Sequence, residues 1–439
     1  MLRQIRTTIT ELVVASLLVS FPNAKADTWE DFFQKGLFAR EQGHYKEAQH
    51  YFEAVLSEAR FDARDIRRAE LNTLIAGVSD VLGESAKAER LYLEAKTILD
   101  SHENVEPTLQ CLILSDLGSF HSKQGRLEEA EAYLKQALAV ASRVFGEGDA
   151  RTASNKANLG RLYTIEGRLA DAEGLLVDAV RVHESVLPAG HPDRIASENG
   201  LAALYATEGR SASAELIIQK VSKAAPQLGD QHPLYAASLM EIAGVYRLQG
   251  RPGHGEPLLR KALAIYETSI GPDCPPVAYT LLFISIDALS AKEPSIAENH
   301  LLRALNILRK TNGPDHPMTA VAEYRLAQAY SLQMKYAQAE RLLKHALAIQ
   351  ERIYPNGQMA IADTLYGLAE VEAVQRRYTD AEWNYQRAIS IYENVNRASP
   401  SLAIALQHYA KVLRIKRTTE AKALERRATE LEQAAKSLH

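Results

Sequence analysis

Residues 158–172 read NLGRLYTIEGRLADA, two apolar stretches on either side of a glycine. Leu159 is followed by apolar residues three and four positions later, which is the spacing of a helix and not of a strand. The residues from Leu169 onward return to this spacing. Gly167 lies between the two stretches, where a glycine can end a helix in the left-handed conformation. The segment therefore predicts a helix, a tight turn and a second helix.

The same pattern recurs along the chain at intervals of 40 to 42 residues. Its clearest mark is a column of small residues in the second helix, made of Ala48, Ala88, Ala130, Ala172, Ala214, Gly255, Ala297, Ala339, Ala381 and Ala421. One helix pair cannot bury its own apolar face, so successive pairs must stack on each other. The chain is therefore predicted to be all-α, a right-handed superhelical α-solenoid of about ten helix–turn–helix repeats over residues 27–439.

The junctions between repeats carry a polar residue directly before a proline. The residues before these prolines are His191, His232, Cys274 and His316. Proline suits the first position of a helix, and the residue before it can cap the helix. A metal site would need three or four ligands that converge on one point, whereas these residues are one or two repeats apart. We therefore expect helix caps here, with no metal and no cofactor.

The segment 158–172, the period near 42 residues and the junctions that end in His-Pro resemble tetratricopeptide repeats of the kinesin-light-chain type. The resemblance covers residues 27–439 and is weakest at 27–65 and 400–439, as expected of degenerate capping repeats. It implies that the first helix of each pair lines a concave, ligand-binding face. This type of repeat usually carries two asparagines in that helix, and only Asn158 and Asn199 match them here.

The first 26 residues have the features of a secretory signal peptide. Arg3 and Arg6 precede a short apolar run, and Ala24-Lys25-Ala26 forms a cleavage site of the A-x-A type. The sequence predicts cleavage after Ala26 and a periplasmic or secreted protein. The alternative is an uncleaved membrane anchor, which would have to place Glu11 inside the lipid.

The composition of the chain and the motifs that it lacks exclude several classes of function. The formal net charge of −4 leaves no basic excess for a nucleic-acid backbone. The two cysteines exclude a disulfide framework. The sequence contains none of the common nucleotide-binding, zinc-protease or serine-hydrolase motifs. Asp287 is a charge in an otherwise apolar column, and we interpret it as relaxation of a degenerate repeat rather than as a ligand-contacting acid.

The candidate binding residues are those that we expect to lie on the concave face. An apolar set is expected to face the groove of repeats six to nine, namely Met240, Tyr279, Leu282, Phe283, Ile286, Tyr324 and Tyr366. A polar set is expected further toward the N-terminus, namely Asn158, Arg161 and Asn199. An exposed apolar patch usually marks a binding site, although these side chains could instead pack on each other across the groove.

The predicted function is a non-enzymatic scaffold that binds a protein or peptide partner. One alternative is an exported subunit of an envelope assembly that docks through its ends. A less favoured alternative is an enzyme with a site on the concave face, because no convergent acid–base or nucleophile set is found.

Overall fold

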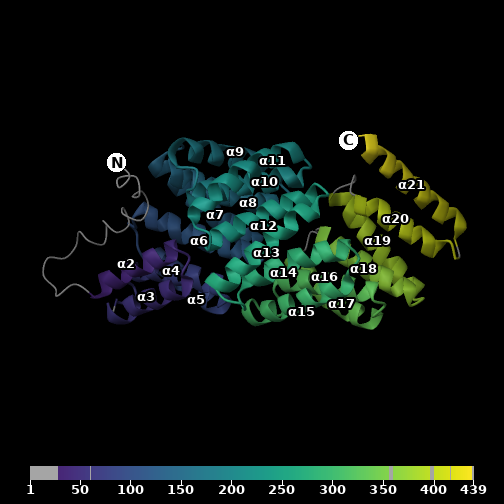
Figure 1. The fold of residues 1–439 in the computed structure, drawn as a ribbon, viewed down its shortest axis with the longest axis horizontal. Coiled ribbons are helices and arrows are strands. Elements are labelled where there is room, and N and C mark those ends of the chain that lie inside the picture. The colour runs from purple at the N-terminus through teal and green to yellow at the C-terminus, as the bar shows by residue number, and fades with distance from the viewer. Residues whose placement is uncertain (1–27, 60, 355–358, 396–399, 416, 438–439) are drawn as a thin grey trace. The chain divides into compact units, whose positions relative to one another are not determined.

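The computed structural model describes residues 28–59, 61–354, 359–395, 400–415 and 417–437 (Figure 1). The predicted signal peptide, residues 1–26, lies outside this range. Among the described residues, no helix is both long and apolar enough to cross a membrane.

Twenty α-helices and one short 3₁₀-helix make up the described chain, and the α-helices follow one another in pairs (Figure 1). The pairs are α2 (Thr28–Glu41) and α3 (Tyr45–Glu58), α4 (Ile66–Leu82) and α5 (Ser85–Asp100), α6 (Pro107–Lys123) and α7 (Leu127–Phe145), α8 (Ala150–Glu166) and α9 (Leu169–Val186), α10 (Pro192–Thr207) and α11 (Ser211–Ala224) with η1 (Ala225–Leu228), α12 (Pro233–Leu248) and α13 (Pro252–Ser269), α14 (Pro275–Ser290) and α15 (Pro294–Thr311), α16 (Pro317–Leu332) and α17 (Tyr336–Ile353), α18 (Met359–Val374) and α19 (Tyr378–Val395), and α20 (Pro400–Leu413) and α21 (Thr418–Ser437). The prediction of an all-α solenoid of about ten helix–turn–helix repeats is confirmed.

The chain divides into two units, and the boundary falls inside α14. The first unit ends at Thr280 and the second begins at Leu281. Helix pairs therefore occur in both units. The terminal pairs, α2–α3 and α20–α21, have the same architecture as the others, and their role as caps stays a prediction.

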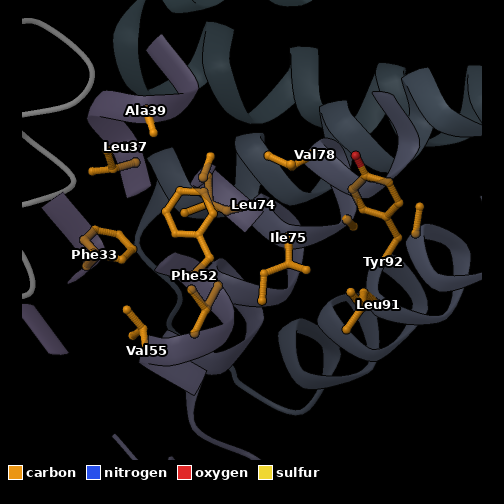
Figure 2. Close-up of a cluster of buried hydrophobic side chains, with 14 of the residues drawn as sticks. Phe33, Leu37, Ala39, Phe52, Val55, Leu74, Ile75, Val78, Leu91 and Tyr92 are labelled. Atoms are coloured by element: carbon orange, nitrogen blue, oxygen red, sulfur yellow. The ribbon is translucent and has the colours of Figure 1, made fainter. Parts of the chain in front are cut away.

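Small side chains let the two helices of a pair approach closely. Ala172 is fully buried, and a Cβ added at Gly160 would lie 2.8 Å from the Cγ of Leu176. Larger side chains fill the remaining space, as Figure 2 shows for α2 to α5, where Phe52, Ile75 and Tyr92 are among the packed residues. Close packing of this kind makes each interface sensitive to added volume.

Ion pairs connect the turn of one repeat with the second helix of the repeat before it. In the first unit Arg168 contacts Glu131 at 2.8 Å, and in the second unit Arg377 contacts Glu340 at 2.6 Å. The further pairs of this series are Arg126–Glu89, Arg210–Glu173, Arg251–Glu215, Lys335–Glu298 and Arg417–Glu382. Each surface pair contributes little, about 0–1 kcal/mol, so packing of the apolar faces supplies most of the stability between neighbours.

The junction histidines are helix caps, as predicted. The Nδ1 atoms of His191, His232 and His316 each accept a hydrogen bond from the backbone N–H two residues later, at 3.2, 3.1 and 3.1 Å. His232 also connects distant repeats, because its Nε2 lies 2.8 Å from the carbonyl oxygen of Glu41. Since Nδ1 accepts, Nε2 must carry the proton and donate it.

The first repeat therefore touches the sixth inside the first unit. Close to the His232–Glu41 bond, a Cβ added at Gly43 would lie only 2.3 Å from Cδ of Pro233. Gly43 also has a positive φ of 76°. Glycine at this turn is thus required by its backbone conformation and by the close approach of α12.

Candidate functional site

The first helices of successive pairs line two hollows, one within each unit. The polar groove belongs to the first unit, has a volume of about 650 Å³ and lies over α6, α8, α10 and α12. Its lining includes all three residues of the predicted polar set, together with Ser119, Lys123, Ile165, Ala196, Ser238 and Glu241. Asn158, Arg161 and Asn199 therefore line one groove, and their role in binding a partner stays a prediction.

The two asparagines join neighbouring helices. Nδ2 of Asn158 donates to Oγ of Ser115 at 2.9 Å, and Nδ2 of Asn199 donates to Oγ of Ser238 at 3.2 Å. Asn199 is 9% exposed, and its buried Oδ1 has no hydrogen-bond partner in the described structure. The side chain of Arg161 is exposed in the same groove. The groove thus offers the guanidinium of Arg161 as a donor to a bound molecule, whereas the Oδ1 of Asn199 is buried beneath its surface.

Asp116 of α6 and Glu241 of α12 have raised pKa values. Desolvation raises the pKa of Asp116 to about 6, against the opposing effect of Arg40 and Lys123. Desolvation also raises the pKa of Glu241, with Arg161 and Arg247 opposing it. The side chain of Glu241 is exposed to solvent in the groove. We therefore attribute the rise in its pKa to the surrounding walls of the groove and not to full burial.

The aromatic pocket belongs to the second unit and has a volume of about 510 Å³. It lies between the C-terminal halves of α14, α16 and α18. Three residues of the predicted apolar set line it, namely Ile286, Tyr324 and Tyr366. The other lining residues are Leu289, Ser290, Arg325, Ala327, Gln328, Ser331, Leu332, Tyr336, Leu343, Gly367, Glu370, Val371 and Val374.

Tyr324 and Tyr366, two of the three tyrosines that line the pocket, are half-buried and are held by hydrogen bonds. Nε2 of Gln328 donates to the hydroxyl oxygen of Tyr324 at 2.9 Å, and the guanidinium of Arg325 lies 5.1 Å from the Tyr324 ring centre. The Tyr366 hydroxyl lies 3.0 Å from Nδ1 of His408, and its ring meets that of Tyr385 edge to face at 6.2 Å. Desolvation raises the pKa of Tyr324 and of Tyr366, so these two hydroxyls stay protonated at neutral pH.

Not every residue of the predicted apolar set reaches this pocket. The prediction that Leu282 faces the groove is wrong, because its side chain is only 2% exposed and packs in the interior. Met240, Tyr279 and Phe283 are half-buried and line neither hollow. Met240 accepts a hydrogen bond on its sulfur from the Thr280 hydroxyl at 3.1 Å. The seven residues therefore do not form one surface.

The sequence reasoning missed the polar residues of the pocket. Arg325, Gln328 and Glu370 come from the same faces of α16 and α18 as the two tyrosines. Gln328 and Glu370 each lie four positions after one of the predicted tyrosines, a spacing that places them on the same helix face and could have identified them. The half-buried Asp287 lines neither hollow. Across the described ranges, no group of three or more metal-ligating side chains is found.

Comparisons with known proteins concern the repeats. A family model described as tetratricopeptide repeat matches residues 109–185, 193–268, 234–310 and 292–352, which is more than half of the chain. A second model of the same description matches residues 32–62. A search of curated protein sequences finds no match.

Several solved structures are similar to this chain. A Rap protein complexed with Competence and Sporulation Factor has 13% identity, covers 84% of this chain and 98% of its own, and has a TM-score of 0.61. BtubC from P. vanneervenii has 19% identity, covers 57% of this chain and 94% of its own, and has a TM-score of 0.37. The TPR-like repeats of a putative kinesin light chain from Podosopora anserina have 22% identity. They cover 54% of this chain and 94% of their own, with a TM-score of 0.29.

Proposed function

Because this chain belongs to the tetratricopeptide-repeat family, we propose that it is a non-enzymatic scaffold that holds a protein or peptide partner on the inner faces of its helix pairs. Fold alone does not define function, so the proposal depends on the chemistry of the sites. The aromatic pocket is the observation that carries it.

The pocket has the composition of a recognition site. Ile286, Leu289 and Val374 supply apolar surface, while three tyrosines supply rigid rings with polar hydroxyl groups. Binding pockets are mostly apolar, occupy about 300–1,000 Å³ and contain a few polar groups that orient the ligand. Here Arg325, Gln328 and Glu370 are such groups.

A neighbour of the same fold supports ligand binding by such helix pairs. The similar Rap protein was solved in complex with Competence and Sporulation Factor. For this chain we propose a protein or peptide ligand of its own, bound in the aromatic pocket or in the polar groove. A single ligand need not fill both.

The experiment is capture of partners from cell-envelope extract by two variants with matched charge. Ile286→Arg places a cation in the pocket, whereas Ile296→Arg changes an isoleucine of α15 that is 47% exposed and does not line it. Partners captured by the wild type should be lost with Ile286→Arg and kept with Ile296→Arg. Equal capture by both variants, with unchanged melting, would remove the pocket from the binding function.

The use of envelope extract rests on a second proposal, that the protein is exported. The basic start, the apolar run and the A-x-A site support cleavage after Ala26 and a periplasmic or secreted location. Mass spectrometry of the native protein should find Asp27 as its first residue. An intact Met1 in the membrane fraction would favour an anchored protein. Cross-linking to a fixed envelope neighbour through α2–α3 or α20–α21 would support the alternative of a subunit that docks through its ends.

A further inference from the structure

Three non-glycine residues in the described chain have a positive φ, and all three occupy the same position in successive repeats. They are Lys292, Met334 and Arg376, with φ values of 60°, 60° and 63°. Each lies in the turn between the two helices of its pair. The corresponding positions of the six preceding repeats are Gly43, Gly83, Gly125, Gly167, Gly209 and Gly250. We call the three residues the rim.

The rim residues hold a conformation that glycine would adopt with less strain. Side chains with a Cβ are disfavoured there, and proteins tend to keep such strain where it serves a function. The turns themselves are intact, since the backbone N–H groups of Met334 and Lys335 donate to Ser331 and Tyr330 at 3.0 and 2.8 Å. The long side chains are thus not needed to close the turn.

The rim side chains are exposed. Met334 is 75% exposed, the highest value among the large apolar residues in the described ranges. Lys292 and Arg376 have no ion-pair partner within 4.0 Å in the described part of the chain, whereas Arg377, directly after Arg376, pairs with Glu340. The rim therefore presents two uncompensated positive charges on either side of an apolar residue.

The rim borders the aromatic pocket. Lys292, Met334 and Arg376 each follow by two positions a residue that lines it, and these lining residues are Ser290, Leu332 and Val374. Leu332 and Val374 are themselves 53% and 57% exposed. Exposed apolar side chains therefore lie at the pocket edge beside Met334 and Arg376, while Ser290 lies there beside Lys292. The two charged rim residues are positive, and carboxylates nearby are Glu370 in the pocket lining and Glu293 next to Lys292.

We propose that the rim and the aromatic pocket together bind an acidic amphipathic helix of a partner protein. The inference rests on the proposed function and specifies the chemistry of the partner. Its apolar residues would cover the pocket edge and Met334, and its carboxylates would lie opposite Lys292 and Arg376. Such charges steer association and select the partner, while the apolar contact supplies affinity.

Repeat spacing favours a helix as the occupant. α16 and α18 contact each other, so equivalent positions on them lie about one helix separation apart, roughly 8–10 Å. Two turns of a helix, seven residues, rise about 10.5 Å. A helix with an apolar residue opposite Met334 and a glutamate seven residues further on would therefore match Met334 and Arg376. The proposal extends the same repeat spacing to Lys292, with a second glutamate seven residues before the apolar residue.

The test uses the full-length chain and a synthetic alanine-rich helical peptide with that pattern, leucine in the centre and glutamate seven residues to each side. A second peptide has lysine in place of both glutamates. Fluorescence anisotropy should show that the wild type binds the glutamate peptide at least about tenfold more tightly. The preference should decrease with added salt, because exposed charges are screened.

Two variants separate the contribution of the rim side chains to binding from the effect of their positive φ on stability. K292G/M334G/R376G should lose the preference for the glutamate peptide while its urea midpoint rises, because glycine relieves the strain. K292Q/R376Q should lose the preference without the rise in midpoint, because it removes charge and keeps side chains at positive φ. A glycine variant that binds as well as the wild type, or that unfolds at lower urea, would overturn the proposal.

The same peptides distinguish this inference from the proposed function. If the wild type binds both peptides equally and Ile286→Arg abolishes that binding, the pocket binds partners and the rim does not select them. If neither peptide binds, the acidic helix is rejected as the occupant. The extract experiment then decides separately whether the pocket captures any partner.

Discussion

Glu70 is a carboxylic acid inside the helix packing of α4, where only 5% of its surface is exposed. Desolvation and, to a smaller extent, the charge of Glu106 together raise its pKa to about 7, while Arg40 opposes the shift. The unfolded chain loses the proton near pH 4, whereas the folded chain keeps it up to about pH 7. The folded state therefore binds more protons in this window, and stability falls as the pH rises through it.

Glu70→Gln should remove this contribution because the amide is neutral at every pH. We expect the variant to match the wild type near pH 4.5 and to be more stable near pH 8, by at most about 3 kcal/mol. Urea unfolding at both pH values measures the difference. Asp116 has a raised pKa for the same reason and still titrates in both proteins, so it should cancel in the comparison. A constant difference at both pH values would contradict the burial of a neutral acid.

At the scale of helices, His232 serves two elements at once. Its Nδ1 caps α12, and its Nε2 donates to the Glu41 carbonyl at the end of α2. His191 caps α10 in the same way, and among the described residues its side chain makes no second hydrogen bond. The two histidines thus form a matched pair within the first unit.

His232→Ala should destabilise the first unit more than His191→Ala. Loss of a cap costs about 0.5–2 kcal/mol in either variant, and loss of the second hydrogen bond adds about 0.5–1.5 kcal/mol for His232 only. Hydrogen exchange should become faster around Glu41–Lys46 in His232→Ala and stay unchanged there in His191→Ala. Identical exchange of this turn in both variants would show that the link between the first and sixth repeats has no energetic value.

Local signals in the sequence were enough to predict the helix pairs, their turns and their caps. The turn at Gly167 and the cap at His316 depend on neighbouring residues, whose preferences act over a few positions. The contact between Gly43 and Pro233 could not be predicted in this way, because it depends on how rotations accumulate over five repeats. The same limit explains Leu282, where a small rotation of the helix decides between the groove and the interior.

At the scale of the molecule, nearest-neighbour packing determines how far a local defect spreads. In repeat architectures each pair contacts mainly its neighbours, so stability is close to a sum of local terms. This chain departs from a simple linear array within the first unit, because the first repeat also contacts the sixth. A substitution that destabilises one helix pair of this unit can therefore destabilise the whole unit. The second unit, from Leu281 onward, has its own packing.

Ala172→Leu tests this division. Ala172 is fully buried between α8 and α9, and the backbone oxygen of Ala172 lies only 3.3 Å from a Cβ added at Gly160. The added atoms have no free space, and overpacking of this kind costs about 1–3 kcal/mol. Hydrogen exchange should become fastest in α8 and α9, with smaller increases in other helices before Thr280. The helices from α15 to α21 should keep wild-type exchange. Equal acceleration in both units would mean that the whole chain unfolds as one cooperative body, whereas an increase limited to α8 and α9 would mean that the contact between the first and sixth repeats transmits no stability.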